Sequence, residues 1–456
     1  MIFSNLMTKE IDNCINIVNE DIKYLSPASR VPYYPLVIKR GHGAIIEDID
    51  GNEYIDMLSS AAALNTGHAH PKIVEAIIQQ VREFIHYTPA YMYHEPLVKL
   101  AKELANITPG NFNKQVAFGL SGSDAIDGMI KFARAYTGRS KIISYIQAYH
   151  GSTYGALSLS AVSLNMRKKI GPLLPDIYHI PYPDCYRCPV GQEENSCSME
   201  CLKQLKDAFK YYIPANEVAA IVIEPIAGDA GLIIPPKKYM ESLYNLCKEN
   251  GILFVSDEIQ QGFGRTGKWF GIEHFGIEPD IVIMGKAIAS GMPMSAIVAR
   301  EEILQSLEAP AHLFTMGGNP VSCRAALATI NVIRDENLIQ HTTELGKHAM
   351  ERFNKLKEKY EIIGDVRGIG LSIGVDLVTD RVTKEKAREA AAKISYRCWE
   401  KGIILTFFAN SVLRIQPPLV ISKEQIDKAI DIIEESILEY LSGEIPDQVL
   451  DVIKGW

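Results

Sequence analysis

Between residues 219 and 300 the chain alternates short, uninterrupted apolar runs with an amphipathic segment. The runs "AAIVIEPI", "GILFVSDEI", "PDIVIMGK" and "SAIVAR" are rich in β-branched residues, and "KKYMESLYNLCKEN" lies between the first two. Continuous apolar runs of this length, separated by a helix, are typical of parallel strands that are buried on both faces of a sheet. The pattern therefore predicts an α/β fold with a large, mostly parallel sheet.

Three ionisable residues, Glu224, Asp257 and Lys286, come at or just past the carboxyl ends of these runs. Ligands bind at this edge of open α/β sheets. A single acid there could be a helix cap or a turn former, but three strand ends with ionisable groups indicate one shared site. Lys286 itself allows two interpretations. Its stem could lie along the core with its ammonium group in solvent, or its amine could be a nucleophile that forms a Schiff base.

The length of 456 residues predicts more than one domain. We expect an N-terminal segment at 1–60, a large domain at 61–330 and a smaller α+β domain at 331–456, against which the N-terminal segment packs. In the last part, helices are predicted near 384–402 and 422–443, flanking the strand-like "IILTFF" and "VLRIQPPL". Near the start, "AIIEDIDGNEYIDM" predicts a hairpin with its turn at "DG".

Charge and hydropathy exclude some partners. The net charge of -8 and the absence of a basic run argue against nucleic-acid binding. No apolar stretch approaches the roughly 18 residues of a membrane helix, and the first residues lack a signal-peptide pattern. We therefore expect a cytoplasmic protein with no membrane partner.

Four of the eight cysteines, Cys185, Cys188, Cys197 and Cys201, lie in "CYRCPVGQEENSCSMEC". Their C-x2-C-x8-C-x3-C spacing can hold a zinc ion or an iron–sulfur cluster. Free thiols or a redox-sensitive disulfide are the alternatives. Because this insert lies away from the other motifs, we assign it no catalytic role, and we assign no metal ligand from the sequence.

The segment "FGLSGSDAIDGMIKFARAY" runs from an apolar strand into Gly122 and Ser123 and then into a helix. Small residues at a helix N-terminus let the backbone approach a phosphate, but Ser123 as an ordinary helix cap explains the same residues. Together with Asp257 and Lys286, the segment describes a pyridoxal 5'-phosphate site. In such a site a lysine forms the imine, an acid keeps the pyridine nitrogen protonated and a helix start binds the phosphate.

The sequence also resembles the class III aminotransferases of fold type I. The resemblance runs almost end to end and is carried by "NTGHAHP", "SGSDAID", "AYHGSTYG", "EPIAGDAG", "DEIQQGFGRTG", "GKAIASGMP", "TMGGNP" and "VLRIQPPLVI". It implies that Lys286 is the Schiff-base lysine and that Asp257 binds the pyridine nitrogen. It further implies that Tyr149 stacks on the ring and that Gln260 reaches the phenolic oxygen of the cofactor.

The resemblance also implies contacts with phosphate and substrate. Gly122 and Ser123 would bind the phosphate, together with Thr315 from the neighbouring subunit of a homodimer or homotetramer. Arg414 would bind the substrate carboxylate with both guanidinium nitrogens. A core position for Tyr149 and a surface ion pair for Arg414 are the structural alternatives.

Finer features, including "ASGMPMSA", "APAHLFT", "KIGPLLP" and "HYTPAY", resemble the amino-acid racemase and isoleucine 2-epimerase branch of that family. Asp229 in "GDAG" stands where many aminotransferases of the family have glutamate. We expect it to be a second catalytic acid, and the structural alternative is that it pairs with an arginine or holds the loop. The resemblance implies racemisation or 2-epimerisation of neutral, nonpolar amino acids. An aminotransferase of 4-aminobutyrate or ornithine type with 2-oxoglutarate as acceptor is the main alternative, and a cofactor-binding protein without turnover is the third.

Overall fold

The apolar runs form the centre of a seven-stranded sheet in the computed structural model, which describes residues 9–453 and 455. The described chain divides into two compact units. We call residues 71–339 the middle unit. The described residues up to 70, together with those from 340 onward, form the terminal unit. The domain limits predicted at residues 60 and 330 stay a prediction, because compactness does not establish independent folding.

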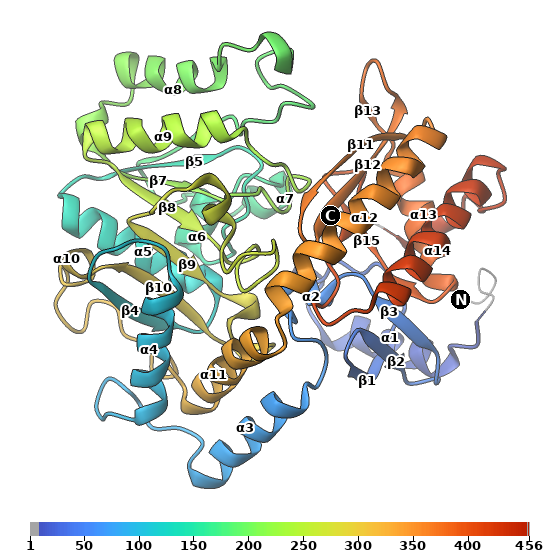
Figure 1. Cartoon of the computed structure of the whole chain (residues 1–456), viewed down its shortest axis with the longest axis horizontal. Coiled ribbons are helices and arrows are strands. Elements are labelled where there is room, and N and C mark those ends of the chain that lie inside the picture. The colour runs from blue at the N-terminus through green and yellow to red at the C-terminus, as the bar shows by residue number, and fades with distance from the viewer. Residues whose placement is uncertain (1–8, 454, 456) are drawn as a thin grey trace. The chain divides into compact units, whose positions relative to one another are not determined.

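The sheet of the middle unit joins strands from most of its length (Figure 1). In spatial order the strands are β4 (Lys114–Gly119), β10 (Ser295–Arg300), β9 (Ile281–Met284), β8 (Leu253–Asp257), β7 (Val218–Ile223), β5 (Lys141–Tyr145) and β6 (Ile177–Ile180). Every residue of β7, β8 and β9 is buried, which explains their uninterrupted apolar sequences. This confirms the mostly parallel α/β sheet.

Strand β10, the run "SAIVAR", differs from the parallel strands expected for these runs. It pairs antiparallel with both β9 and β4. The reason is the connection: only residues 285–294 separate β9 from β10, and a parallel crossover needs a dozen or more residues.

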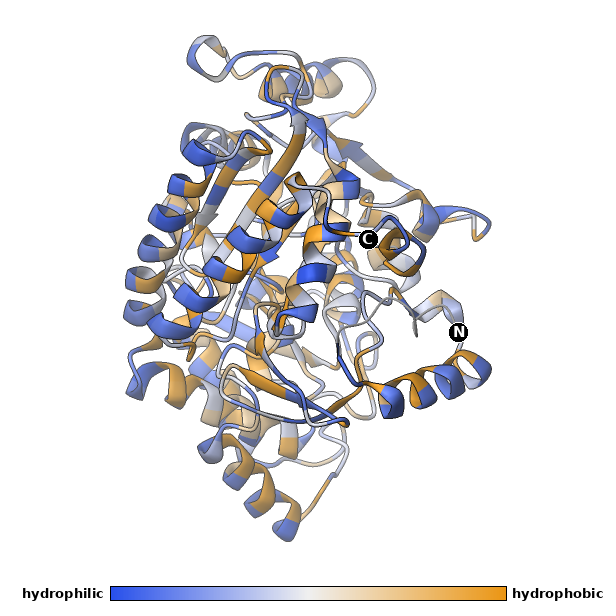
Figure 2. Ribbon diagram, turned by 90° about the vertical axis from the view of Figure 1, so that its right-hand side faces the viewer, coloured by the Kyte–Doolittle hydropathy of each residue, from blue (hydrophilic) through white to orange (hydrophobic). Residues whose placement is uncertain are grey.

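Helices cover this sheet. The long ones are α3 (Pro71–Glu83), α4 (Glu95–Ile107), α5 (Gly122–Thr137), α8 (Glu200–Tyr211), α9 (Lys237–Asn250) and α11 (Pro320–Asp335). The short ones are α6 (Tyr154–Leu159), α7 (Leu164–Arg167), α10 (Glu301–Leu304), η2 (Glu194–Ser196), η3 (Ala215–Glu217), η4 (Gly271–Phe275) and η5 (Lys286–Ala289). Helix α5 packs against β9 and β10, and α9 packs against β8. In Figure 2 the helices alternate hydrophobic and hydrophilic residues along their length, as expected for helices with one buried face.

The terminal unit holds two small sheets. One joins β1 (Ile38–His42), β2 (Ile45–Asp48), β3 (Glu53–Asp56) and β14 (Ile403–Ile404), and the other joins β11 (Ile363–Ile369), β12 (Ser372–Asp380), β16 (Val412–Ile415) and β15 (Thr406–Phe408), with β13 (Glu385–Lys386) beside β12. The antiparallel pair β2 and β3 confirms the hairpin predicted around "DG". There Gly51 has a φ of +91°, a conformation that glycine adopts without strain.

The helices of the terminal unit are α1 (Asp12–Tyr24), η1 (Pro27–Ser29), α2 (Ser59–Ala62), α13 (Arg388–Glu400), α14 (Lys423–Leu441) and α15 (Val449–Val452), while α12 (Leu338–Lys359) begins in the middle unit. Helices α13 and α14 confirm the two amphipathic helices predicted near 384–402 and 422–443.

Among the described residues, no helix combines the length and the apolar character needed to span a bilayer.

Candidate functional site

Three neighbouring parallel strands, β7, β8 and β9, bring the predicted ionisable residues to one edge of the sheet. Glu224 follows β7 directly, Asp257 is the last residue of β8, and Lys286 begins η5 just after β9. Lys286 has a φ of +45°, in the left-handed region that side chains other than glycine rarely adopt. Such a conformation costs on the order of 1–3 kcal/mol and is concentrated at functional sites. All three residues therefore lie at the carboxyl ends of neighbouring strands.

Asp257 is hydrogen-bonded to His150, a residue for which the sequence predicted no role. Its Oδ2 atom lies 2.6 Å from Nδ1 of His150, and both residues are buried. Its Oδ1 atom accepts a hydrogen bond of 3.0 Å from the backbone N–H of Ile259. Burial alone would lower the pKa of His150, but the hydrogen bond and charge of Asp257 raise it above its usual value. The carboxylate is thus held in place from two sides.

Glu224 joins two loops of the site. Its Oε1 atom accepts the backbone N–H of Tyr149 at 3.0 Å, and its Oε2 atom accepts that of Gly228 at 2.9 Å. Burial raises the pKa of this carboxyl to about 7; the charge of His150 opposes the rise and the charge of Asp257 adds to it. Glu224 therefore positions both the loop of Tyr149 and the loop that carries Asp229.

The start of α5 has the geometry that a phosphate site needs. The N-cap is Ser121, whose side chain accepts the N–H of Asp124 in a capping box. The alternative of Ser123 as the helix cap is therefore wrong. The Oγ atom of Ser123 instead accepts the backbone N–H of Ser152 at 3.0 Å. Gly122 opens the helix, and the first-turn N–H groups of a helix favour an anion.

Glycines allow the backbone segments around this helix start to approach closely. A Cβ atom on Gly122 would lie 2.6 Å from Cδ1 of Ile259, and one on Gly285 would lie 3.4 Å from the backbone of Gly122. The residue before Lys286 therefore lies next to the start of α5.

Asp229 and Gln260 lie together. The amide nitrogen of Gln260 donates to Oδ1 of Asp229 over 3.4 Å. A Cβ atom on Gly228 would lie 2.2 Å from the amide oxygen of Gln260, so only glycine leaves room for that side chain. Both predicted residues thus belong to the same corner of the middle unit.

Two further predicted residues lie on other segments of the chain. Thr315 is exposed in the loop between α10 and α11. Arg414 lies in β16 of the terminal unit, where its guanidinium carbon is 4.0 Å from the centre of the Phe408 ring. The roles of both residues in phosphate and carboxylate binding stay predictions.

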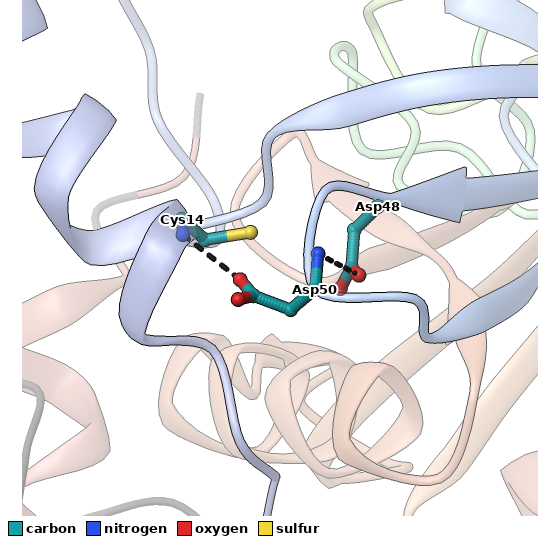
Figure 3. Close-up of side chains that lie close together, drawn as sticks. All are labelled: Cys14, Asp48 and Asp50. Carbon is teal, nitrogen blue, oxygen red and sulfur yellow. Dashed lines mark hydrogen bonds between the residues drawn. The ribbon is translucent and has the colours of Figure 1, made fainter.

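A second group of ligand-type residues lies in the terminal unit (Figure 3). Cys14, Asp48 and Asp50 form the one group of metal-ligand type detected among the described residues. The carboxylate of Asp50 accepts the backbone N–H of Cys14 at 2.9 Å, and Asp48 accepts that of Asp50 at 3.0 Å. Burial, with the hydrogen bond to Asp50, raises the pKa of the Cys14 thiol to about 12. These residues join α1 to the turn between β2 and β3, and a protonated thiol is a poor metal ligand.

Comparison with known proteins decides the family. The model of the family "Aminotransferase class-III" matches residues 26–437. The chain belongs to the class III aminotransferase family. An isoleucine 2-epimerase of Lentilactobacillus buchneri is 48% identical over 96% of this chain and 97% of its own length. A leucine/methionine racemase of Thermococcus litoralis is 49% identical over 96% and 99%. A probable 4-aminobutyrate aminotransferase of Bacillus subtilis is 35% identical over 87% and 92%.

A solved structure agrees with this class III assignment. A Bacillus anthracis aminotransferase superimposes with a TM-score of 0.87 at 31% identity, over 94% of this chain and all of its own. The family confirms the fold-type I architecture and pyridoxal 5'-phosphate as cofactor. The donor set fits that cofactor, since it combines a buried carboxylate, an amine at the adjacent strand end and a helix start beside it.

Proposed function

We propose that this enzyme inverts the Cα atom of neutral, nonpolar amino acids as a racemase or 2-epimerase. The supporting observation is the near-full-length identity of 48% and 49% to an epimerase and a racemase, against 35% to an aminotransferase. Conversion to a 2-oxo acid, with 2-oxoglutarate as amino-group acceptor, is the second candidate. It is favoured by the fold, which the Bacillus anthracis aminotransferase shares.

When bound, pyridoxal 5'-phosphate accepts the negative charge that develops at Cα as its proton leaves. In the proposed site Lys286 binds the cofactor, Asp257 keeps its pyridine nitrogen protonated, and Gly122 and Ser123 bind its phosphate. Tyr149 covers the ring face, and Gln260 reaches the phenolic oxygen. His150 orients Asp257 through the 2.6 Å hydrogen bond.

Inversion needs a proton to leave one face of Cα and another to arrive on the opposite face. We assign the first transfer to the amine of Lys286 and the second to the carboxyl group of Asp229, directly or through a water. Arg414 would bind the substrate carboxylate and so fix which bond at Cα points toward Lys286. The 3.4 Å contact with Gln260 supports a fixed position for Asp229.

Incubation of the pure holoenzyme with L-isoleucine alone tests the function. We expect D-allo-isoleucine to accumulate toward an equilibrium mixture with little 2-oxo acid, measured by chiral chromatography and a 2-oxo acid assay. Lys286→Ala is the matched control. Stoichiometric 2-oxo acid, formed only when an amino-group acceptor is supplied, would establish the aminotransferase instead.

A second copy of the chain is the proposed partner. Large apolar side chains are exposed between α3 and α4 and beside Thr315; they are Ile85, Tyr87, Tyr91, Met92, Tyr93, Leu313 and Met316. Clustered exposed apolar residues indicate an interaction surface. If Thr315 completes the phosphate site of a neighbour, sedimentation during turnover should show the active species as a dimer or tetramer. A monomer with full activity would contradict this.

The cellular location we propose is the cytoplasm. Its support is that no disulfide joins any of the eight cysteines, all of which lie among the described residues. Cytosolic proteins keep their thiols reduced.

A further inference from the structure

Four cysteines of the middle unit have no part in the proposed site. Cys185 and Cys188 form one close pair in the segment after β6, and Cys197 and Cys201 form a second pair at the start of α8. The structure joins none of the four in a disulfide, and all four are partly buried. We propose that these cysteines bind a structural zinc ion, which fixes the segment 184–201, called here the cysteine segment.

The cysteine segment has no hydrophobic core of its own. None of the side chains described in it is buried, and the side chain of residue 194 lies outside the described part. Before α8 begins, its regular structure is limited to the single turn of η2. Long segments of this kind in a compact domain need another source of order. A structural zinc site supplies it, because the binding free energy of the metal becomes folding free energy.

Local hydrogen bonds shape both pairs as short turns. The Oδ1 atom of Asp184 accepts the N–H groups of Tyr186 at 2.9 Å and Arg187 at 3.0 Å, which fixes the turn that carries Cys185 and Cys188. In the second pair, the N–H of Met199 donates to Sγ of Cys197 over 3.3 Å. Two close pairs separated by a loop are the usual ligand arrangement of structural zinc sites.

Zinc binding requires the four sulfur atoms to come closer to one another. Among the described residues, no three of these sulfur atoms lie within 4.8 Å of one another. Tetrahedral zinc holds each sulfur at about 2.3 Å from the metal. None of the described side chains in the cysteine segment is buried, so no packed core has to be disrupted. The required movement therefore has a low free-energy cost.

Metal analysis of the wild-type holoenzyme tests the site. The protein is purified without a metal-affinity column, and zinc and iron are measured by mass spectrometry. We expect about one zinc per chain, released when a mercurial reagent blocks the thiols. The double variant Cys185→Ser, Cys188→Ser should contain less than a tenth of that zinc. The matched control Cys247→Ala, which removes a buried thiol of α9 outside the cysteine segment, should keep it.

The zinc content of the wild-type protein alone can overturn the proposal. The test therefore does not depend on whether the double variant folds. Protein that contains no zinc after growth in zinc-supplemented medium would exclude the site. If the protein instead contained iron and acid-labile sulfide, the cysteines would hold an iron–sulfur cluster, and the zinc proposal would be wrong. A chain lighter by two hydrogen atoms per cysteine pair would show that the cysteines form disulfides.

Discussion

Nδ1 of His150 and Oδ2 of Asp257 lie 2.6 Å apart, although 107 positions separate the two residues in the chain. Both side chains are buried, so neither has water as an alternative partner. The carboxylate that we propose as the partner of the pyridine nitrogen therefore has a fixed partner of its own within the protein. Removing one member of such a buried pair leaves the other without compensation, and this typically costs about 3–5 kcal/mol.

His150→Phe should accordingly lower the free energy of unfolding of the apoenzyme by about 3–5 kcal/mol. His150→Asn, whose amide group still donates a hydrogen bond, should lose less. Urea unfolding of both variants and the wild type at pH 7 measures the difference. Equal stability of His150→Phe and the wild type would show that Asp257 does not depend on this histidine.

Gly122→Ala should weaken cofactor binding, because its new Cβ atom would lie 2.6 Å from Cδ1 of Ile259. Overpacking of this kind costs about 1–3 kcal/mol, which corresponds to roughly a 5- to 150-fold higher dissociation constant. Ile259→Val removes the atom in conflict. The double variant should therefore recover part of the affinity in a fluorescence titration with pyridoxal 5'-phosphate. Ile259→Val alone is the control, and no recovery would place the effect of Gly122 elsewhere.

Lys286→Ala should abolish both activity and the absorption above about 400 nm that a covalently bound, protonated cofactor gives. Circular dichroism should remain that of the wild type, because Lys286 contributes little to the core. Lys237→Ala, at the exposed start of α9, should change none of these properties. Retention of the absorption band by Lys286→Ala would assign the cofactor to another lysine.

Asp229→Asn tests the second proton transfer. Asparagine keeps an oxygen that can accept the hydrogen bond from Gln260, so the loop should stay in place. We expect racemisation to fall by about 10²–10⁴-fold in both directions. Lys286 should still exchange the α-proton of one enantiomer with deuterated solvent, as followed by NMR. Racemisation at the wild-type rate would reduce Asp229 to a loop-holding role.

Glu224 predicts a pH dependence of stability. Its folded-state pKa of about 7 lies above the ordinary value of 4.5, so the folded state binds a proton more tightly than the unfolded state. This contribution is fully present below about pH 4.5 and is lost as the pH rises toward 7, by about 3 kcal/mol in total.

Glu224→Gln should therefore flatten the decline in the stability of the apoenzyme between pH 5 and 7. The readout is the slope of unfolding free energy against pH, since the amide also disturbs the bond to Tyr149 or Gly228 and lowers stability at every pH. Identical slopes for the variant and the wild type would assign the proton to another group.

The sequence predicted those elements in which every residue is equally buried or in which a local turn signal is present. Strands β7, β8 and β9 are buried on both faces and therefore read as uninterrupted apolar runs, and the turn at Gly51 carries its own local signal. Strand β10 was assigned the wrong direction because its apolar run looks the same in either orientation.

The parts of the site that the sequence did not predict depend on tertiary structure. His150 reaches Asp257 only because β5, β7 and β8 are neighbours in the sheet, and a histidine after an apolar strand gives no sign of that order. The left-handed backbone of Lys286 was equally hidden, since glycine is the residue that normally signals such a conformation.

The parallel pairing of β3 with β14 has a consequence for synthesis on the ribosome. Ile55 pairs with Ile403, about 350 residues later in the chain. At about 5–20 residues per second, the edge of the N-terminal hairpin waits on the order of tens of seconds for its partner strand. The whole of residues 71–339 emerges in that interval and can fold first. An unpaired strand edge invites association with other chains, so the edge of β3 is open to such association until β14 has been made.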